Sequence, residues 1–201
     1  MEKINQIDEK LRKYSSAHVF VFLAIVGIVI LFLALTSAYG LSKPQWTWSK
    51  FSFPKLFLIS TVVLGLSSFT INKVVLFFKE DDLKRFKKFT AYTLVLSLLF
   101  LALQVAAWFQ LNKSGIYLAG KPDGSYLYLI SALHAMHLVI GIVLLFYIWL
   151  VAKYKLIDPV KKLIYFSNKT NLKHLSLISI YWHFVDVLWI YLLLFFLFNH
   201  L

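Results

Sequence analysis

Residues 175–198 read LSLISIYWHFVDVLWIYLLLFFLF, and this stretch decides the fold class of the chain. It is almost wholly apolar, and Asp186 is its only carboxylate. A helix of about 20 apolar residues spans the hydrocarbon core of a bilayer and satisfies its own backbone hydrogen bonds there. Four further stretches have this character, which gives expected spans at residues 17–39, 55–78, 89–110, 126–152 and 175–198. The sequence therefore predicts an all-α integral membrane protein, a bundle of five transmembrane helices.

The composition supports this class and excludes others. Of the 201 residues, 60% are hydrophobic and 18% aromatic, and the mean hydropathy is +0.75. A soluble domain needs more polar sequence than this to cover its core. A net charge of +12 would suggest a nucleic-acid partner for a soluble protein. Here the bases lie in short clusters between the apolar runs, so we expect no nucleic-acid partner.

The sequence has no cysteine and four prolines. The first fact excludes disulfides, thiolate metal sites and cysteine nucleophiles. Every proline falls between the expected spans or at the edge of one, where a helix tolerates it. No repeat, low-complexity tract or long linker divides the chain, so residues 1–201 are expected to form a single membrane domain.

The 21 Lys and Arg residues are distributed unevenly between the two sides of the expected bundle. Sixteen share one side: Lys3, Lys10, Arg12, Lys13, Lys73, Lys79, Lys84, Arg85, Lys87, Lys88, Lys153, Lys155, Lys161, Lys162, Lys169 and Lys173. Five lie on the other: Lys43, Lys50, Lys55, Lys113 and Lys121. Cytoplasmic loops carry the excess of bases, so we expect a cytoplasmic N-terminus and an outer C-terminus. The aromatic residues expected at the membrane interfaces are Tyr39, Trp46, Trp48 and Trp149.

Ionisable side chains at membrane depth are costly, so each is a structural or functional candidate. The fourth span contributes His134 and His137, and the fifth contributes His183 and Asp186. The spacing of His134, His137 and Gly141 places them on one face of the fourth span. A glycine there lets a neighbouring helix approach closely. We therefore expect spans four and five to pack together, with Asp186 hydrogen-bonded to a histidine and both shielded from lipid.

From spacing alone, four interpretations of this cluster remain open. One is an interhelical hydrogen-bond network that fixes packing, and the others are a metal site, a haem site and a proton relay. Spans one to three offer a haem no histidine partner except His18, at an edge. The sequence has no phosphate loop, nucleophile elbow or HExxH motif, and no broken span of the transporter kind. These absences argue against a catalyst in its own right.

Two segments are similar to the signatures of a known family. Tyr181–Trp189, YWHFVDVLW, resembles YWHFVDVVW, and Leu133–Gly141, LHAMHLVIG, resembles FHGLHVIIG. Asp123–Tyr126, DGSY, is similar to the start of DGVYG. On these residues the chain resembles subunit III of the haem–copper oxidases (cytochrome c oxidase), in its short five-helix bacterial form. The resemblance extends from Arg12 to the C-terminus.

The resemblance implies a non-catalytic subunit of a bacterial terminal oxidase that passes electrons from cytochrome c to oxygen in aerobic respiration. Such a subunit stabilises subunit I, supports its proton uptake and binds phospholipid in a cleft, while haem and copper belong to the partner subunits. Other oxidase subunits and a respiratory supercomplex are further expected partners, and the bacterial cytoplasmic (inner) membrane is the expected location. The resemblance makes the following residues an intramembrane packing network: His134, His137, Trp182, His183, Asp186 and Trp189.

The chain departs from the family pattern at three places. Ile25–Ile28 stands where the first span usually has a buried acid, and Val105 follows Gln104 where a glutamate is usual. Val75 and Leu76 replace paired histidines that some members carry. Alternative assignments are subunit III of a quinol oxidase and the accessory membrane protein of a nitric-oxide reductase, and outside the family a small haem-binding carrier or a transporter.

A basic cluster follows the second span and consists of Lys84, Arg85, Lys87 and Lys88. Two interpretations are open for it. The bases contact anionic lipid headgroups, or they serve only to set the topology.

Overall fold

The computed structural model describes residues 16–42 and 55–200. Its elements are α2 (Ser16–Ser42), α3 (Lys55–Lys79), α4 (Leu83–Lys113), α5 (Pro122–Leu150), a π-helical turn η2 (Val151–Lys155), α6 (Pro159–Ser167) and α7 (Lys169–His200). Five of the described helices are long and apolar enough to cross a membrane, with α5 and η2 counted as one. The prediction of an all-α, multi-pass membrane protein is confirmed.

Helix α4 begins at Leu83 instead of residue 89, because a cap lies ahead of the apolar run. The Asp82 carboxylate accepts a hydrogen bond from the Arg85 backbone N–H at 2.9 Å and another from Arg85 Nε at 2.6 Å. Lys, Arg and Leu are good helix formers, so the helix continues through the charged segment. These two hydrogen bonds from Arg85 lower the pKa of Asp82.

The segment between the fourth and fifth predicted spans is helical, which the sequence analysis did not predict. Helix α6 begins at Pro159, with Asp158 accepting from the Val160 N–H at 2.9 Å. Phe166 packs α6 against the bundle, because its ring centroid lies 4.9 Å from that of Phe78 on α3. The helix is short, so its apolar period was too brief to be distinguished from a loop.

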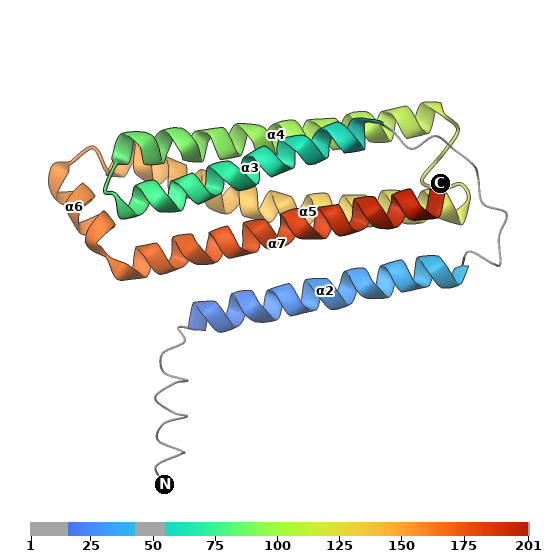
Figure 1. Cartoon of the computed structure of the whole chain (residues 1–201), viewed down its shortest axis with the longest axis horizontal. Helices are drawn as coiled ribbons and strands as arrows, with labels where there is room; N and C mark the ends of the chain where they lie inside the picture. The colour runs from blue at the N-terminus through green and yellow to red at the C-terminus, as the bar shows by residue number, and fades with distance from the viewer. Residues whose placement is uncertain (1–15, 43–54, 201) are drawn as a thin grey trace, which may run out of the picture.

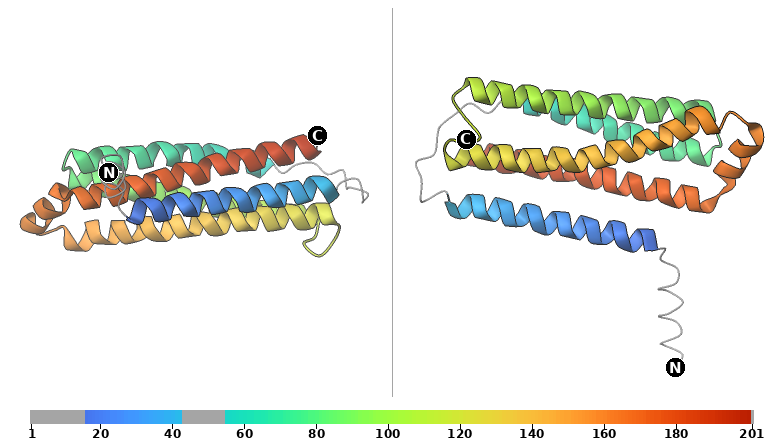
Figure 2. Two further views of the ribbon diagram at one scale, coloured as in Figure 1. Left: turned by 90° about the horizontal axis from the view of Figure 1, so that it is seen from below. Right: turned by 180° about the vertical axis from the view of Figure 1, so that it is seen from behind.

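The long helices lie side by side along the long axis of the molecule (Figures 1 and 2). Helices α3 and α4 form a hairpin that packs on α7 and α5, respectively. Helix α2 lies at the edge of the bundle along α5 and α7 (Figure 2, left). Only four of its described residues are buried: Ile28, Phe32, Thr36 and Tyr39. The remaining four spans therefore make the core, and α2 is an outer layer.

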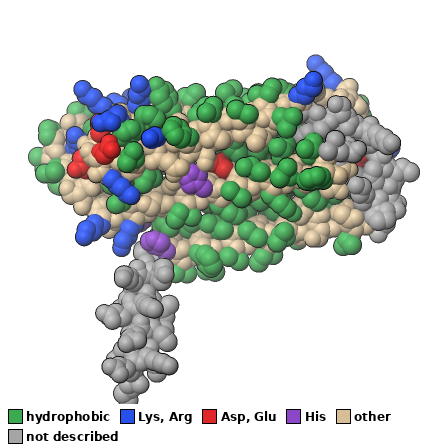
Figure 3. Space-filling view, in the orientation of Figure 1, with side chains coloured by type: hydrophobic (Ala, Val, Ile, Leu, Met, Phe, Trp, Pro, Cys, Tyr) green, Lys and Arg blue, Asp and Glu red, His purple; other side chains and the backbone are tan. Residues whose placement is uncertain are grey.

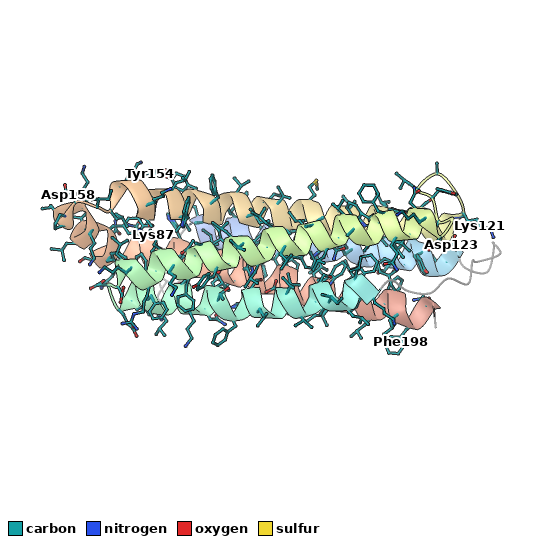
Figure 4. The ribbon with its side chains drawn as sticks, turned by 90° about the horizontal axis from the view of Figure 1, so that it is seen from above. Lys87, Lys121, Asp123, Tyr154, Asp158 and Phe198 are labelled. Atoms are coloured by element: carbon teal, nitrogen blue, oxygen red, sulfur yellow. The ribbon has the colours of Figure 1, made fainter. Side chains whose placement is uncertain are left out.

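The two ends of the bundle differ in charge. Figure 4 places Lys87, Tyr154 and Asp158 at one end and Lys121, Asp123 and Phe198 at the other. Lys and Arg side chains gather at the first end, near α6 and the α3–α4 turn (Figure 3). By the positive-inside rule this is the cytoplasmic end.

Some residues used in the sequence analysis lie outside the described part of the chain. They are the bases of residues 3–13, Lys43, Lys50, Trp46 and Trp48. Among the described interfacial aromatics, Trp149 lies near the basic end, with the Nζ of Lys153 4.8 Å from its ring centroid.

Candidate functional site

The YWHFVDVLW segment of α7 packs on α3 through ring nitrogens and small hydroxyl groups. Trp182 Nε1 donates to Ser67 Oγ at 3.2 Å, and Trp189 Nε1 donates to Thr61 Oγ1 at 3.0 Å. Both indoles are almost fully buried. Such polar contacts between membrane helices contribute about 0.6 kcal/mol each on average. The two tryptophans thereby fix the register of α7 against α3.

His183 lies between these tryptophans and also faces α3. Its Nδ1 is 2.7 Å from Ser68 Oγ, and its Nε2 is 2.8 Å from Asn72 Oδ1. Because an amide oxygen only accepts, Nε2 carries the proton and Nδ1 accepts from the serine hydroxyl in the neutral ring. Both nitrogens of His183 are therefore engaged.

Close packing of α5 on α7 was expected at Gly141, and the structure confirms it. A Cβ atom built on Gly141 would lie 3.0 Å from Cζ3 and 3.1 Å from Cε3 of Trp182. One turn away, the Tyr181 hydroxyl donates to the backbone oxygen of His137 at 2.8 Å. The glycine thus makes room for the largest side chain of α7.

His134 and His137 were expected on one face, but they meet different helices. The His134 ring is fully buried, 5.1 Å from the ring centroid of Trp189 and 5.9 Å from that of Phe100. The His137 ring lies 5.8 Å from that of Phe32 on α2, and its Nδ1 contacts the Leu133 backbone oxygen at 2.7 Å. A three-residue step turns a helix by about 300°, so the two side chains diverge by about 60°. In a closely packed bundle, this divergence of about 60° brings the two histidine rings against different helices.

The expected hydrogen bond between Asp186 and a histidine is wrong. Asp186 is buried in α7, and neither carboxyl oxygen has a hydrogen-bond partner. His183 is turned toward Ser68 and Asn72 because these groups of α3 lie within reach of its two nitrogens. Asp186, one turn further along α7, therefore has no hydrogen bond to the histidine.

Within residues 16–42 and 55–200, no three His, Asp or Glu side chains are placed to hold a metal ion. The nitrogens of His183 are engaged by α3, and the ring of His134 is enclosed between Phe100 and Trp189. We therefore derive no chemistry from a bound cofactor in this chain.

An apolar groove of about 450 Å³ lies where α2 rests on α5 and α7. Its lining comes from all three helices and includes Gly27, Leu31, His137, Leu144 and Tyr181. The groove exists because α2 packs loosely and carries no large buried polar contact along this stretch. Its walls match the chemistry of an acyl chain.

Sequence analysis assigned no contact to the small polar residues of α3 and α4 that complete this packing. Gln104 Nε2 donates to Ser60 Oγ at 3.2 Å, and the hydroxyls of Thr70 and Thr93 are 2.9 Å apart. Ser60 and Ser67 are seven residues apart, which is two turns of one helix face. This recurrence of small polar residues within an apolar span was the signal that marks a helix-packing face.

Together, the fold and these contacts define a multi-pass integral membrane protein whose helices are joined by aromatic and small polar side chains. Residues 14–200 match the sequence profile of the family described as cytochrome c oxidase subunit III. The chain belongs to this family. The signature-bearing segments of α5 and α7 pack closely on each other at Gly141 and Tyr181.

Several curated relatives are similar to the chain. The cytochrome bo(3) ubiquinol oxidase subunit 3 of Buchnera aphidicola is 28% identical over 139 residues, which are 68% of this chain and 66% of the relative. The cytochrome c oxidase subunit 3 of Thermostichus vulcanus is 28% identical over 169 residues, 83% of this chain and 75% of the relative. The probable cytochrome c oxidase subunit 3 of Nocardia farcinica is 26% identical over 159 residues, 79% and 72% of the two chains. The chain thus spans about two thirds to three quarters of the length of these relatives.

Proposed function

We propose that the chain is a non-catalytic subunit III of a bacterial haem–copper terminal oxidase that uses cytochrome c. The observation that carries this proposal is that the YWHFVDVLW segment packs on α3. Trp182 and Trp189 donate hydrogen bonds to α3, and both ring nitrogens of His183 are engaged there. Family membership supports the same role.

In this role the chain associates with subunit I and other oxidase subunits in the bacterial inner membrane, stabilises subunit I and supports its proton uptake. Subunit I binds the haem and copper. Apolar side chains remain exposed along the outer faces of α2 and α7, for example Phe20, Phe22 and Val187. Lipid and partner helices cover such faces equally well. A respiratory supercomplex would add contacts at the ends of the bundle.

We propose that the α2–α5–α7 groove holds an acyl chain of a phospholipid. The groove is lined almost wholly by apolar side chains, and the helices that form it lead to the basic end of the bundle. Lys153 and Lys173 flank α6 at that end and suit an anionic headgroup. Bound phospholipid is therefore the only ligand that we assign to the chain itself.

The basic cluster at the start of α4 is proposed as a second contact with headgroups. Lys84, Arg85, Lys87 and Lys88 are all exposed. Arg85 is also bound by Asp82 and lies over the Phe77 ring at 4.8 Å. The three lysines are thus better placed than the arginine to meet anionic lipid.

The test is purification of the tagged chain from its native membrane in mild detergent. We expect a large haem-bearing polypeptide to co-purify, together with oxygen consumption driven by reduced cytochrome c. An untagged membrane is the control for non-specific recovery. A colourless chain recovered alone would refute the proposal, and a haem spectrum from the chain alone would show that a histidine is a ligand after all.

Subunit III of a quinol oxidase is the second candidate. It is favoured by relatives named for that activity, including a probable quinol oxidase subunit 3 of Staphylococcus saprophyticus, 27% identical over 148 residues. The same purified complex distinguishes the two, because oxygen consumption driven by a quinol and not by cytochrome c would establish the second.

A further inference from the structure

A polar seam runs between α3 and α7 from the basic end of the bundle toward its middle. It begins as a groove of about 400 Å³ whose lining includes Asn72, Lys79, Ser176 and Ser179. Lys79 is the last residue of α3, so the groove opens at the end of the helix. The rise of 1.5 Å per residue places Asn72 about 10 Å and Ser68 about 16 Å deeper than Lys79. The seam therefore reaches the middle of the apolar layer.

Hydrogen bonds continue the seam beyond the groove. Asn72 lines the groove and contacts His183 Nε2 at 2.8 Å, and His183 Nδ1 contacts Ser68 at 2.7 Å. Asp186 follows His183 by three residues on α7, so the two side chains are neighbours on one face of the helix. Asp186 is 5% exposed, and neither of its oxygens has a hydrogen-bond partner. The hydrogen-bonded row from Asn72 to Ser68 thus ends one helical turn from a buried carboxyl group that has no hydrogen-bond partner.

The donors and acceptors of this row agree with one another when Asp186 is protonated. The carboxylic acid donates to the Ser68 oxygen, the Ser68 hydroxyl donates to His183 Nδ1, and His183 Nε2–H donates to Asn72 Oδ1. The bond between the carboxylic acid and Ser68 is not formed in the structure, so this step needs a rotation of the Asp186 or Ser68 side chain. Every member of the row is then neutral, which suits an apolar layer where an isolated charge is costly.

We propose that the α3–α7 seam is a proton route from the cytoplasmic end of the bundle to Asp186, and that Asp186 is a proton-holding site in exchange with the cytoplasm. A proton that leaves Asp186 passes to Ser68 as the Ser68 proton passes to His183 Nδ1, while the Nε2 proton is released toward the groove. The reverse sequence reloads the site. Ser68 and His183 are the transfer groups, and Asn72 holds the Nε2 end of the ring.

Other ionisable groups near the seam are few among the described residues. Lys73 and Lys79 lie on α3, and Lys73 Nζ is 5.3 Å from the Phe69 ring. Helix α5 contributes His134 and His137, which face α4 and α2, respectively. Helix α2 contributes His18, which lines an apolar pocket beside Leu177 and Ile180. None of these residues is a link in the row, so the exchange is assigned to His183 and Asp186.

The test is infrared hydrogen–deuterium exchange of the chain in its native complex. The carbonyl-stretch band of protonated Asp186 is assigned as the band that Asp186→Asn removes. If that variant does not assemble, ¹³C-aspartate labelling of the wild type assigns the band instead. The other buried aspartate, Asp123, lies at the opposite end of the bundle (Figure 4). Asp123→Asn distinguishes the two aspartate bands.

We expect the Asp186 band to be present and to shift promptly in D₂O. Ser68→Ala and Asn72→Leu should each slow the exchange by about tenfold or more, the effect of about 1.4 kcal/mol on a barrier. Thr61→Val is the matched control, because it removes a hydroxyl bonded to α7 in the opposite half of the same interface. Exchange in that variant should equal exchange in the wild type.

Two results would overturn the inference. If no protonated carboxyl band depends on Asp186, the group is ionised and holds no proton. If the band exchanges at one rate in all variants, or never exchanges, the seam is not the route. The polypeptides in the purified complex are recorded separately, so neither result bears on the oxidase assignment.

Discussion

Replacement of Gly141 by alanine tests the packing of α5 on α7 most directly. The added Cβ would lie 3.0 and 3.1 Å from two carbons of the Trp182 ring and 3.4 Å from Cε1 of Tyr181. Carbon atoms pack best at about 3.5–4.0 Å, so the indole must move by about half an ångström. Trp182 is 1% exposed and its Nε1 is held by Ser67. The ring therefore has no free space to move into.

The expected loss of stability in Gly141→Ala is obtained by comparison with a second helical glycine that has open space around it. Gly65 lies in the middle of α3, and a Cβ built on it meets nothing within 4 Å. Gly65→Ala therefore reports only the better helix propensity of alanine, about 1 kcal/mol. Gly141→Ala gains the same propensity but overpacks the interface, at a cost of about 1–3 kcal/mol. The free energies of unfolding of the two variants should differ by that amount, about 5- to 150-fold in the equilibrium constant.

Reversible unfolding of the chain in mixed detergent micelles with increasing dodecyl sulfate, followed by tryptophan circular dichroism, measures the difference. Trp182→Leu completes a double-mutant cycle, since the penalty at Gly141 should vanish once the large ring is gone. Equal stability of the two alanine variants would refute the packing argument. A penalty that persists without the indole would place its cause elsewhere in the bundle.

Three further predictions concern other parts of the chain. Gly124→Ala should lower the yield of folded protein and expose the α4–α5 loop to protease, because its Cβ would lie 2.8 Å from Cγ2 of Ile116. Asp82→Ala should lower the stability of the folded protein at neutral pH. The pKa of Asp82 in the folded protein lies below its ordinary value of 3.8. The stability that Asp82 contributes is therefore complete above pH 3.8 and is lost as the pH falls through the folded-state pKa. Thermal unfolding of the two proteins should therefore converge in acid, and a constant difference would contradict the role of Arg85 contacts. His134→Leu should leave the free energy of unfolding unchanged or raise it by about 1 kcal/mol. Both ring nitrogens of His134 lack a hydrogen-bond partner, so the substitution breaks no hydrogen bond. A loss of more than about 2 kcal/mol, measured by chemical unfolding, would reveal a polar contact at this ring.

The groove beneath α2 and the α3–α7 seam differ in the polarity of their linings. Helix α2 rests on α5 and α7 through scattered contacts, including a 2.9 Å bond between Thr36 and Tyr191. The apolar groove lies beneath it. The seam lies on the other side of α7, against α3, where serines and an asparagine are concentrated. One helix, α7, therefore contributes an apolar wall to the groove and a polar wall to the seam.

The sequence by itself determined the spans, the uneven placement of charge and the positions of the prolines. Runs of apolar residues must be long enough to cross the hydrocarbon layer, and this requirement acts on each segment separately. It therefore predicted the five spans without any knowledge of their neighbours. Gly141 was also identified, because a glycine on the face of His134 and His137 lets a neighbouring helix approach closely.

Only the tertiary structure decided which helices meet and which polar groups pair. A membrane helix is apolar on all sides, since lipid and neighbouring helices present the same chemistry, so hydrophobic periodicity does not mark its inner face. For this reason His134 and His137 turned to different neighbours, and Asp186 has no hydrogen bond to the expected histidine. A rotation of about 60° about the axis of a helix changes which neighbouring helix each of its side chains contacts. That rotation is set by the packing of all five helices together.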